Sequence, residues 1–205
     1  MHVAVLAASG GTGHQLALQA LDRGHTVTAI ARRPAALELP VSDRLILATG
    51  DARDATSIAR AVDAADVVLS GLGVVRGEQA DILLAGARAL IEAAPRRIIW
   101  LGAFGTGLSA EYSSAFARRL IGLFLRSQLA DKVAADAAML AAGATVFHAG
   151  PLTNGLLSTS YRVVEVSDVP RRLFPSSVSR ATVASAMLDV AEGPSRPGGV
   201  LVPLS

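Results

Sequence analysis

Short apolar runs alternate along this chain with longer stretches in which apolar residues recur at helical spacing. The short runs are rich in Val, Ile, Leu and Ala, which is typical of buried strands, whereas the longer stretches predict amphipathic helices. The predicted strands are residues 2–7, 26–31, 44–48, 67–70, 97–101, 145–149 and 200–203. The predicted helices are residues 11–23, a helix that Asp54 opens as its N-cap, 79–94, 112–142 and 179–191.

The regular alternation of strands and helices predicts one fold class. Strands separated by helices are joined by crossovers and therefore pair in parallel. Strands that read as continuous apolar runs are covered on both faces. We therefore expect a Rossmann-like α/β fold, a doubly wound parallel sheet in a three-layer α/β/α sandwich. We expect residues 1–205 to form a single domain, with an irregular substrate loop at about residues 150–177 that is rich in Pro, Ser and Gly.

Composition and charge exclude several classes of protein. Hydrophobic residues make up 51% of the chain and charged residues 18%, which supplies a large core and excludes disorder. The net charge is +2, and no run of basic residues is longer than two. A nucleic-acid-binding surface would gather basic residues more densely, so we expect no nucleic-acid partner.

Cysteine and histidine usage narrows the chemistry further. The chain has no cysteine, which excludes disulfides and thiolate chemistry. The four histidines are scattered without ligand spacing, so we expect no metal. The apolar stretch 120–125 is too short to span a bilayer, and residues 1–6 do not resemble a signal peptide. We therefore expect a cytoplasmic protein with no membrane partner.

A glycine-rich segment lies directly between the first strand and the first helix. It reads Ala7-Ala8-Ser9-Gly10-Gly11-Thr12-Gly13. Glycines at this point let the backbone turn tightly and approach a pyrophosphate, while the following helix offers N–H groups and the positive end of its dipole. The segment predicts a dinucleotide site that includes Gly10 to Gly13. The alternative is an ordinary turn between strand and helix.

Two arginines indicate which dinucleotide is bound. Arg32 and Arg33 follow the second strand, where an acidic residue would bind the ribose 2′-hydroxyl of NAD. Guanidinium groups instead suit a 2′-phosphate, because they donate charge-assisted, bidentate hydrogen bonds. We therefore expect NADP(H) as cofactor. For one of the two arginines, exposure to solvent without a ligand is a serious alternative.

Two further segments end predicted strands and should line the same crevice, since ligands bind outside the carboxyl ends of parallel strands. Gly50-Asp51 closes the third strand, and Gly71-Leu72-Gly73 closes the fourth. Asp51 could accept hydrogen bonds near the adenine edge, or it could cap the following turn. The cofactor-binding residues that we expect from these two segments are Asp51, Ala52, Leu72 and Gly73.

Taken together, these motifs resemble those of the atypical short-chain dehydrogenase/reductases. The group that is most similar contains small NAD(P)H-binding proteins, among them flavin/biliverdin-IXβ reductase and the NmrA-like sensors. Ala7 stands where the family has the first glycine of its loop, and we expect one methyl to be tolerated in a turn that keeps φ negative. The motif Ser179-Arg180-Ala181-Thr182-Val183-Ala184 resembles a helix start of the family, with Thr182 in place of the usual acid. The resemblance further implies that the loop Gly150, Pro151, Leu152 and Thr153 passes beside the nicotinamide.

The positions that carry catalysis in the classical relatives are altered here. Those enzymes use a Tyr-x-x-x-Lys pair with a Ser. Lys132 is the only lysine in the chain, but Gln128 stands four residues before it and cannot act as an acid. Gly102 occupies the position where Ser is often found. The classical triad is therefore absent and the catalytic residues are unknown, although Lys132 could hold the cofactor ribose or could be a solvated helix lysine.

Three polar residues near these positions are weaker candidates. Ser109 and Tyr112 follow the fifth strand and could reach a substrate, while packing at a helix start is the more ordinary role for Tyr112. His148 ends the sixth strand and could face the crevice. A hydrogen-bonded structural histidine is the interpretation that we prefer for it.

The leading hypothesis is an NADPH-dependent reductase that transfers hydride to a small conjugated acceptor of the flavin, quinone or tetrapyrrole type. Hydride passes directly to such acceptors, so the protein mainly supplies orientation and needs no classical triad. The alternative is a non-catalytic NADP(H)-binding redox sensor that regulates a protein partner. An epimerase or dehydratase ranks last because the length leaves little room for a sugar-nucleotide lobe. We expect a small-molecule acceptor as partner, and a monomer or homodimer.

Overall fold

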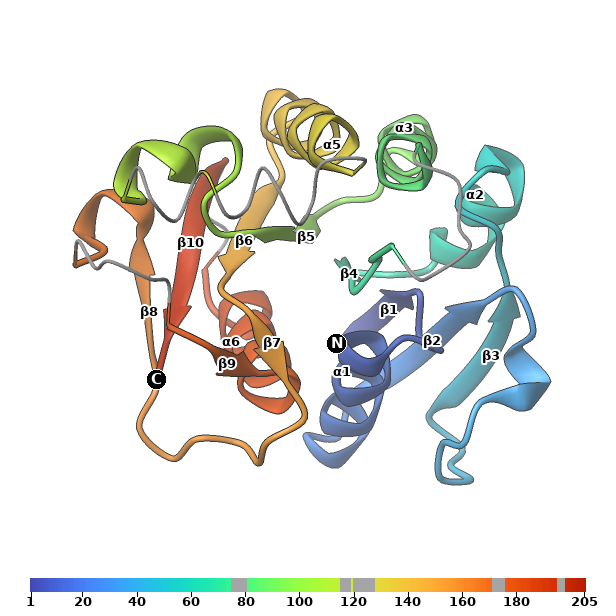
Figure 1. Ribbon diagram of the computed structural model, residues 1–205. Helices are drawn as coiled ribbons and strands as arrows, with labels where there is room; N and C mark the ends of the chain where they lie inside the picture. Colours follow the sequence, from blue (N-terminus) through green and yellow to red (C-terminus); the bar gives the residue numbers. More distant parts are fainter. Residues whose placement is uncertain (75–80, 115–118, 120–127, 171–175, 195–197) are drawn as a thin grey trace.

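An eight-stranded sheet forms the centre of the computed structural model, which describes residues 1–74, 81–114, 119, 128–170, 176–194 and 198–205 (Figure 1). The strand order is β3-β2-β1-β4-β5-β6-β10-β8, and every pairing is parallel except that of β8 with β10. The strands of this sheet are β1 (His2–Leu6), β2 (Thr26–Ala31), β3 (Leu45–Thr49), β4 (Val67–Ser70), β5 (Ile98–Ala103), β6 (Thr145–Ala149), β8 (Arg162–Glu165) and β10 (Gly199–Leu204). A separate parallel pair consists of β7 (Leu152–Thr153) and β9 (Val178–Ser179).

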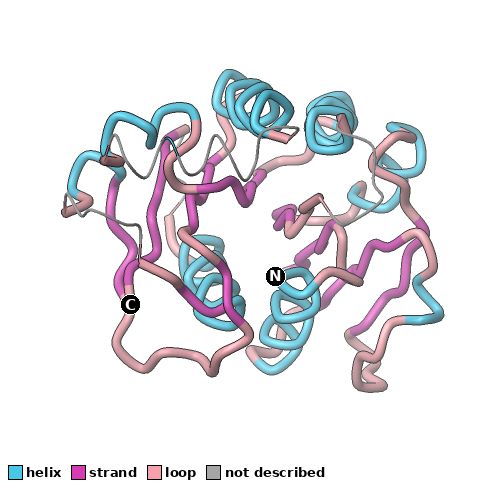
Figure 2. The backbone as a smooth tube through the Cα atoms, in the orientation of Figure 1, coloured by secondary structure: helices cyan, strands magenta, loops and turns pink. Residues whose placement is uncertain are grey.

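Helices cover both faces of the sheet (Figure 2). The α-helices are α1 (Gly11–Asp22), α2 (Ala55–Val62), α3 (Ile82–Ala93), α5 (Leu129–Ala141) and α6 (Arg180–Glu192). Three short 3₁₀ helices are η1 (Pro34–Ala36), η2 (Gly107–Tyr112) and η3 (Val166–Asp168). Helices α1 and α6 lie on one face and α2, α3 and α5 on the other (Figure 1). The fold is therefore the predicted Rossmann-like, doubly wound α/β/α arrangement.

Alternate residues of the central strands feed two separate hydrophobic cores, whereas β3 and β8 at the two ends of the sheet are partly exposed. Along β1, Val3 and Val5 pack with α1 and α6, whereas Ala4 and Leu6 pack with α2 and α3. All four of these side chains are buried, because a strand with helices on both faces has no side open to water. This double burial explains why the strands read as unbroken apolar runs in the sequence.

The first of two predicted segments that differ from the structure is the long helix after the fifth strand. The predicted helix 112–142 is wrong in its first part: residues 107–112 form the 3₁₀ helix η2, and Ser113 is extended at φ −94° and ψ 147°. The hydroxyl of Ser109 donates to Thr106 O and accepts from Gly105 N, which offers this backbone an alternative to an α-helix. Helix α5 begins only at Leu129. Residues 115–118 and 120–127, including the apolar stretch 120–125, lie outside the described residues.

The loop predicted at 150–177 is less irregular than its composition suggests. Strand β8 lies inside it and pairs antiparallel with β10 at the edge of the sheet. Val163 and Val164 belong to this strand, which is short and stands between Ser-rich and Pro-rich segments. Its pairing comes from a partner about forty residues away in the sequence, so local composition does not reveal it.

The strand order predicts where a ligand would bind, at the carboxyl ends of the central strands. Strand β1 pairs with β2 on one side and with β4 on the other, so the chain reverses its direction of winding between β1 and β4. In open parallel sheets, the crevice at such a reversal, beyond the carboxyl ends of the strands, is where ligands bind. Among the described residues, no helix is both long and apolar enough to cross a membrane.

Candidate nucleotide site

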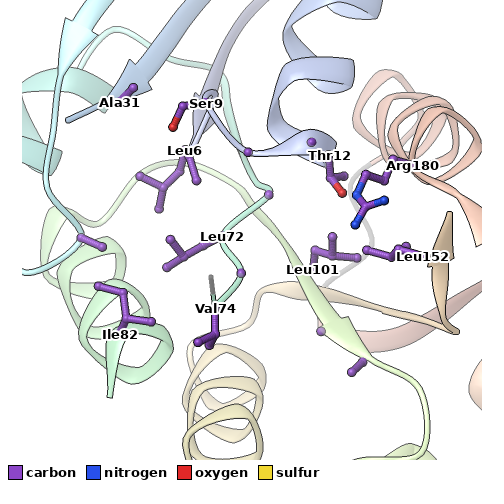
Figure 3. Close-up of a pocket in the computed structure, with 18 of the residues that line it drawn as sticks. Leu6, Ser9, Thr12, Ala31, Leu72, Val74, Ile82, Leu101, Leu152 and Arg180 are labelled. Atoms are coloured by element: carbon purple, nitrogen blue, oxygen red, sulfur yellow. The ribbon is translucent and has the colours of Figure 1, made fainter. Parts of the chain in front are cut away.

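A cavity of about 510 Å³ opens at this reversal of strand order, between the carboxyl ends of the central strands and the first turn of α1 (Figure 3). Most residues predicted for the site come together around it. Those that line the cavity are Gly10, Gly11, Thr12, Arg32, Asp51, Ala52, Leu72, Gly73, Lys132, Gly150 and Leu152. The ends of β2, β3, β4 and β6, the start of α1 and the wall of α5 therefore converge on a single space.

Four predicted site residues do not line this cavity. Arg33 is exposed and precedes η1, while Pro151 and Thr153 are exposed beside the small β7–β9 sheet. Gly13 is buried at the start of α1. A Cβ atom added to it would lie 2.1 Å from Ala7 O, so this glycine allows the helix to pack against the end of the first strand.

The first turn of α1 faces the cavity with uncapped backbone donors. Helix α1 begins at Gly11, and its N-cap residue Gly10 has no side chain that could accept from the helix. Thr12 is 4% exposed and lines the cavity, and its hydroxyl forms no hydrogen bond with a described residue. A helix N-terminus with these donors is suited to bind an anion.

Ala7 corrects one expectation. The turn before α1 does not keep φ negative at this position: Ala7 adopts φ +62°, in the left-handed region. Gly10 N donates to Ala7 O over 2.9 Å, which closes the turn in this conformation. A Cβ atom costs roughly 1–2 kcal/mol in the left-handed region, a cost that glycine would avoid.

We expect Ala7→Gly to leave the free energy of unfolding unchanged or to raise it by up to about 1 kcal/mol. Relief of the left-handed strain outweighs the extra freedom that glycine gives to the unfolded chain. Ala94, the exposed residue that ends α3 at φ +46°, offers a matched control, because Ala94→Gly should act similarly far from the cavity. Urea denaturation would measure both variants. A decrease of about 1 kcal/mol in the free energy of unfolding of Ala7→Gly would contradict this account.

The two charged residues predicted near the adenosine end differ in their surroundings. Arg32 follows β2 and is exposed at the cavity wall. Asp51 follows β3, and its carboxylate accepts from Arg53 N over 2.9 Å, so it does cap the local turn. Its own N–H donates to Ser57 Oγ over 3.0 Å. Asp51 is thus held against the wall by its own turn.

Lys132 lies on the cavity wall, one helical turn after Gln128, which also lines the cavity. Burial lowers the pKa of Lys132 below the ordinary lysine value, while the charges of Asp136 and Asp131 oppose this shift. The folded protein therefore holds this proton less tightly than the unfolded chain does. The contribution of Lys132 to the free energy of unfolding therefore increases as the pH rises toward the ordinary lysine pKa of 10.5. No described residue forms a hydrogen bond or an ion pair with the ammonium group.

A buried polar cluster lies behind the wall of the cavity. His148 is fully buried, and its Nδ1 lies 2.6 Å from Ser109 Oγ and its Nε2 lies 3.1 Å from Asp136 Oδ2. Trp100 Nε1 donates to the other carboxylate oxygen over 3.0 Å. His148 is therefore the hydrogen-bonded structural histidine that we preferred. Ser109 is fully buried with it and does not reach the cavity.

Gly102 is part of this arrangement. It lines the cavity, and a Cβ atom added to it would lie 2.7 and 2.8 Å from the two carboxylate oxygens of Asp136 and 2.8 Å from His148 Cδ2. A serine side chain would not fit here, because the space that it needs is filled by the buried pair. The structure thus gives a packing reason for glycine at this position.

Arg180 lines the cavity although it was not predicted as a site residue. It is the first residue of α6, and its side chain reaches toward Thr12 (Figure 3). The sequence contained one signal, because Arg180 belongs to the helix-start motif that resembles the family. Its distance of 169 positions from Gly11 hides the fact that the two residues touch.

Comparison with known proteins identifies the class of the chain. The model of the NAD(P)H-binding family matches residues 7–194, and the chain therefore belongs to this family. This result confirms the predicted resemblance to the small NAD(P)H-binding group. A comparison with curated protein sequences finds no match.

Solved structures share the fold over the full chain. A short-chain dehydrogenase/reductase from Veillonella parvula in complex with NADP is 17% identical, with a TM-score of 0.82 over 100% of this chain and 94% of its own. The anaerobilin reductase ChuY from Escherichia coli O157:H7 is 21% identical, with a TM-score of 0.77 over 100% and 97%. A protein from Burkholderia pseudomallei is 23% identical, with a TM-score of 0.82 over 100% of both chains. At these identities the likeness establishes the fold.

Proposed function

We propose that this protein is an NADPH-dependent reductase that transfers hydride to a small conjugated acceptor of the flavin, quinone or tetrapyrrole type. The observation that carries the proposal is the cavity itself. The chain belongs to an NAD(P)H-binding family, and its cavity combines an uncapped helix N-terminus with a basic strand end. The described residues that line the cavity include no tyrosine. Such a site can orient a reduced nicotinamide, but it lacks the acid that reduction of a simple carbonyl requires.

The residues at the end of β2 support NADPH rather than NADH. Arg32 lies at the cavity wall where an acid would bind the 2′-hydroxyl of NAD. Its guanidinium would donate to a 2′-phosphate in the bidentate geometry that this group favours. The fold is shared with a protein whose structure holds NADP, which is consistent with this assignment.

We expect Arg32→Met to weaken NADPH binding about 10- to 100-fold and to leave NADH binding unchanged, because hydrogen bonds to a charged group contribute about 1.5–3 kcal/mol. Arg33→Met should have a smaller effect, since Arg33 does not line the cavity. Nicotinamide fluorescence titration would measure both cofactors. Equal weakening of NADPH and NADH by Arg32→Met would contradict the assignment of the 2′-phosphate to Arg32.

When bound, NADPH supplies the hydride, and the chain has three tasks around it. The first turn of α1 would hold the pyrophosphate, and Arg32 the 2′-phosphate. Lys132 would donate hydrogen bonds to ribose hydroxyls from its partly desolvated position, which a guanidinium could not fill in the same way. Gln128 can orient a polar group of the acceptor but cannot protonate it, so the proton would come from water.

Acceptor turnover tests the proposed activity. Purified protein would be given NADPH with FMN, riboflavin, a quinone or biliverdin, and loss of reduced nicotinamide absorbance would be followed for each acceptor. Turnover with any of them supports the reductase. Tight NADPH binding without turnover across the panel would reject it and favour the redox sensor, whose partner would be a protein. We propose that the partner of the reductase is a small-molecule acceptor, and that the protein acts as a monomer or homodimer.

A further inference from the structure

Arg180 occupies a position that is unfavourable unless an anion lies beside it. As the first residue of α6, it adds a positive charge to the positive end of a helix dipole. No acidic residue stands in the first turn of α6 to offset it. The N-terminus of α6 is already capped by Ser179, whose hydroxyl oxygen accepts from Thr182 N over 3.0 Å, so Arg180 is not needed for capping.

The side chain of Arg180 crosses the turn that opens α1. A Cβ atom added to Gly11 would lie 2.8 Å from Arg180 Cδ and 2.9 Å from its Nε. Because Gly11 lacks a side chain, the arginine stem can lie directly on the backbone of this turn. The guanidinium group is thereby held beside the donors of the first turn of α1, toward Thr12 (Figure 3).

The partner of Arg180 is neutral. Its Nη1 donates to Asn154 Oδ1 over 2.7 Å, and within the described ranges no carboxylate forms an ion pair with it. Asn154 follows β7 and is exposed. An amide oxygen holds the guanidinium in place without neutralising its charge, which leaves that charge available to a ligand.

The hydroxyl of Thr12 is a second polar group beside the same part of the cavity (Figure 3). Thr12 is 96% buried, faces the cavity and has no hydrogen-bond partner among the described residues. Its hydroxyl, the uncapped N–H groups of α1 and the guanidinium of Arg180 all present donors to one region. Donors alone, with one full positive charge, fit a phosphate-type oxyanion.

We propose that Arg180 binds the pyrophosphate of the cofactor beside the first turn of α1, and that Asn154 holds its guanidinium ready for this contact. Arg180 and Arg32 then recognise two different phosphates at two ends of the cavity. This inference rests on the proposed function, because it requires that NADPH bind in the cavity. It adds a binding residue and a positioning residue to that site.

Binding of cofactors and of a fragment tests this assignment. Arg180→Met should weaken NADPH and NADH equally, about 10- to 100-fold, as expected for loss of a charge-assisted hydrogen bond. It should leave binding of adenosine 2′-monophosphate, which has no pyrophosphate, unchanged. Arg32→Met should weaken binding of adenosine 2′-monophosphate and of NADPH, and it should leave NADH binding unchanged. Arg88→Met, which removes an exposed charge from α3 outside the cavity lining, is the matched control and should change none of the three affinities.

Variants of Asn154 separate ligand binding from a purely structural role. Asn154→Asp would place a carboxylate on the guanidinium and hold it as an ion pair, so NADPH binding should weaken. In Arg180→Met the same Asp substitution should have a smaller effect, because the group that it traps is gone. If the Arg180–Asn154 contact only fastens the loop after β7 to α6, Asn154→Asp would leave affinity unchanged, and that result would overturn the proposal.

The outcomes distinguish this inference from the function on which it rests. Wild-type protein that binds neither NADPH nor NADH would overturn both. Wild-type binding with unchanged affinity in a normally melting Arg180→Met would overturn the role of Arg180 alone. An Arg180→Met variant that binds NADPH normally but has a raised KM for an anionic acceptor would also overturn it, because the guanidinium would then serve the acceptor.

Discussion

Gly13→Ala is expected to weaken cofactor binding about 100-fold or more and to lower the melting temperature. The added methyl would lie 2.1 Å from Ala7 O and 2.7 Å from Ala7 C, both of which are backbone atoms. Ala7 O cannot move away freely, since it accepts from Gly10 N and closes the turn. The helix must therefore shift off the end of β1, which displaces the uncapped donors of its first turn from the cavity.

The expected size follows from overpacking against rigid backbone. Such overpacking costs about 1–3 kcal/mol, or roughly 2–12 °C in melting temperature for a domain of this size. NADPH affinity should fall about 100-fold or more, because loss of about 3 kcal/mol in anion contacts already corresponds to that factor. Calorimetric unfolding and fluorescence titration would measure the two effects.

Gly73→Ala is the matched control for Gly13→Ala. Gly73 also lines the cavity, but a Cβ atom added to it meets no atom of the described residues within 4 Å. Its melting temperature should stay close to that of the wild type. If Gly13→Ala melted and bound NADPH like the wild type, the tight packing between α1 and the end of β1 would not matter for the site.

Asp136→Ala is expected to cause the largest loss of stability among these variants. Its carboxylate pairs with His148 Nε2 and accepts from Trp100 Nε1, and all three residues are at most 3% exposed. Removing it leaves an imidazole and an indole N–H in the core without their acceptor. Breaking a buried pair in this way costs about 3–5 kcal/mol, equivalent to roughly 6–20 °C in melting temperature.

Asp136→Asn separates the hydrogen bonds from the charge. The amide oxygen can still accept from Trp100 or from His148, so Asn should destabilise less than Ala. The measurement is denaturant unfolding of both variants and of the wild type. Equal losses for Ala and Asn would show that the carboxylate charge, rather than its role as an acceptor, stabilises this cluster.

Much of the cavity could be predicted from sequence because its parts are local. Gly10, Gly11 and Thr12 stand between a strand and a helix, and Arg32 directly follows the next strand. A glycine-rich turn after the first strand of an α/β chain has one geometric outcome, since the strand and helix that flank it are fixed by their apolar patterns. The predicted residues that line the cavity all lie at such element ends or on the wall of one helix.

Prediction from the local sequence failed where a strained backbone conformation or a pairing of distant segments determines the structure. The expectation of negative φ at Ala7 was wrong, because the conformation of that residue is imposed by the packing of α1 on β1. The predicted helix through Tyr112 and Ser113 gave way to hydrogen bonds of Ser109. Strand β8 was missed because its partner β10 follows it by about forty residues.

The amino-acid pattern by itself determined the layers of this protein, most of its strands and helices along the chain, and the glycine-rich turn between β1 and α1. Each of these depends on periodicity or on adjacent residues. Only the tertiary structure brought Arg180 onto Gly11, packed Asp136 against His148 and left no space for a side chain at Gly102. These contacts join residues that are distant in the sequence, and their geometry exists only once α1, α5 and α6 have packed on the sheet.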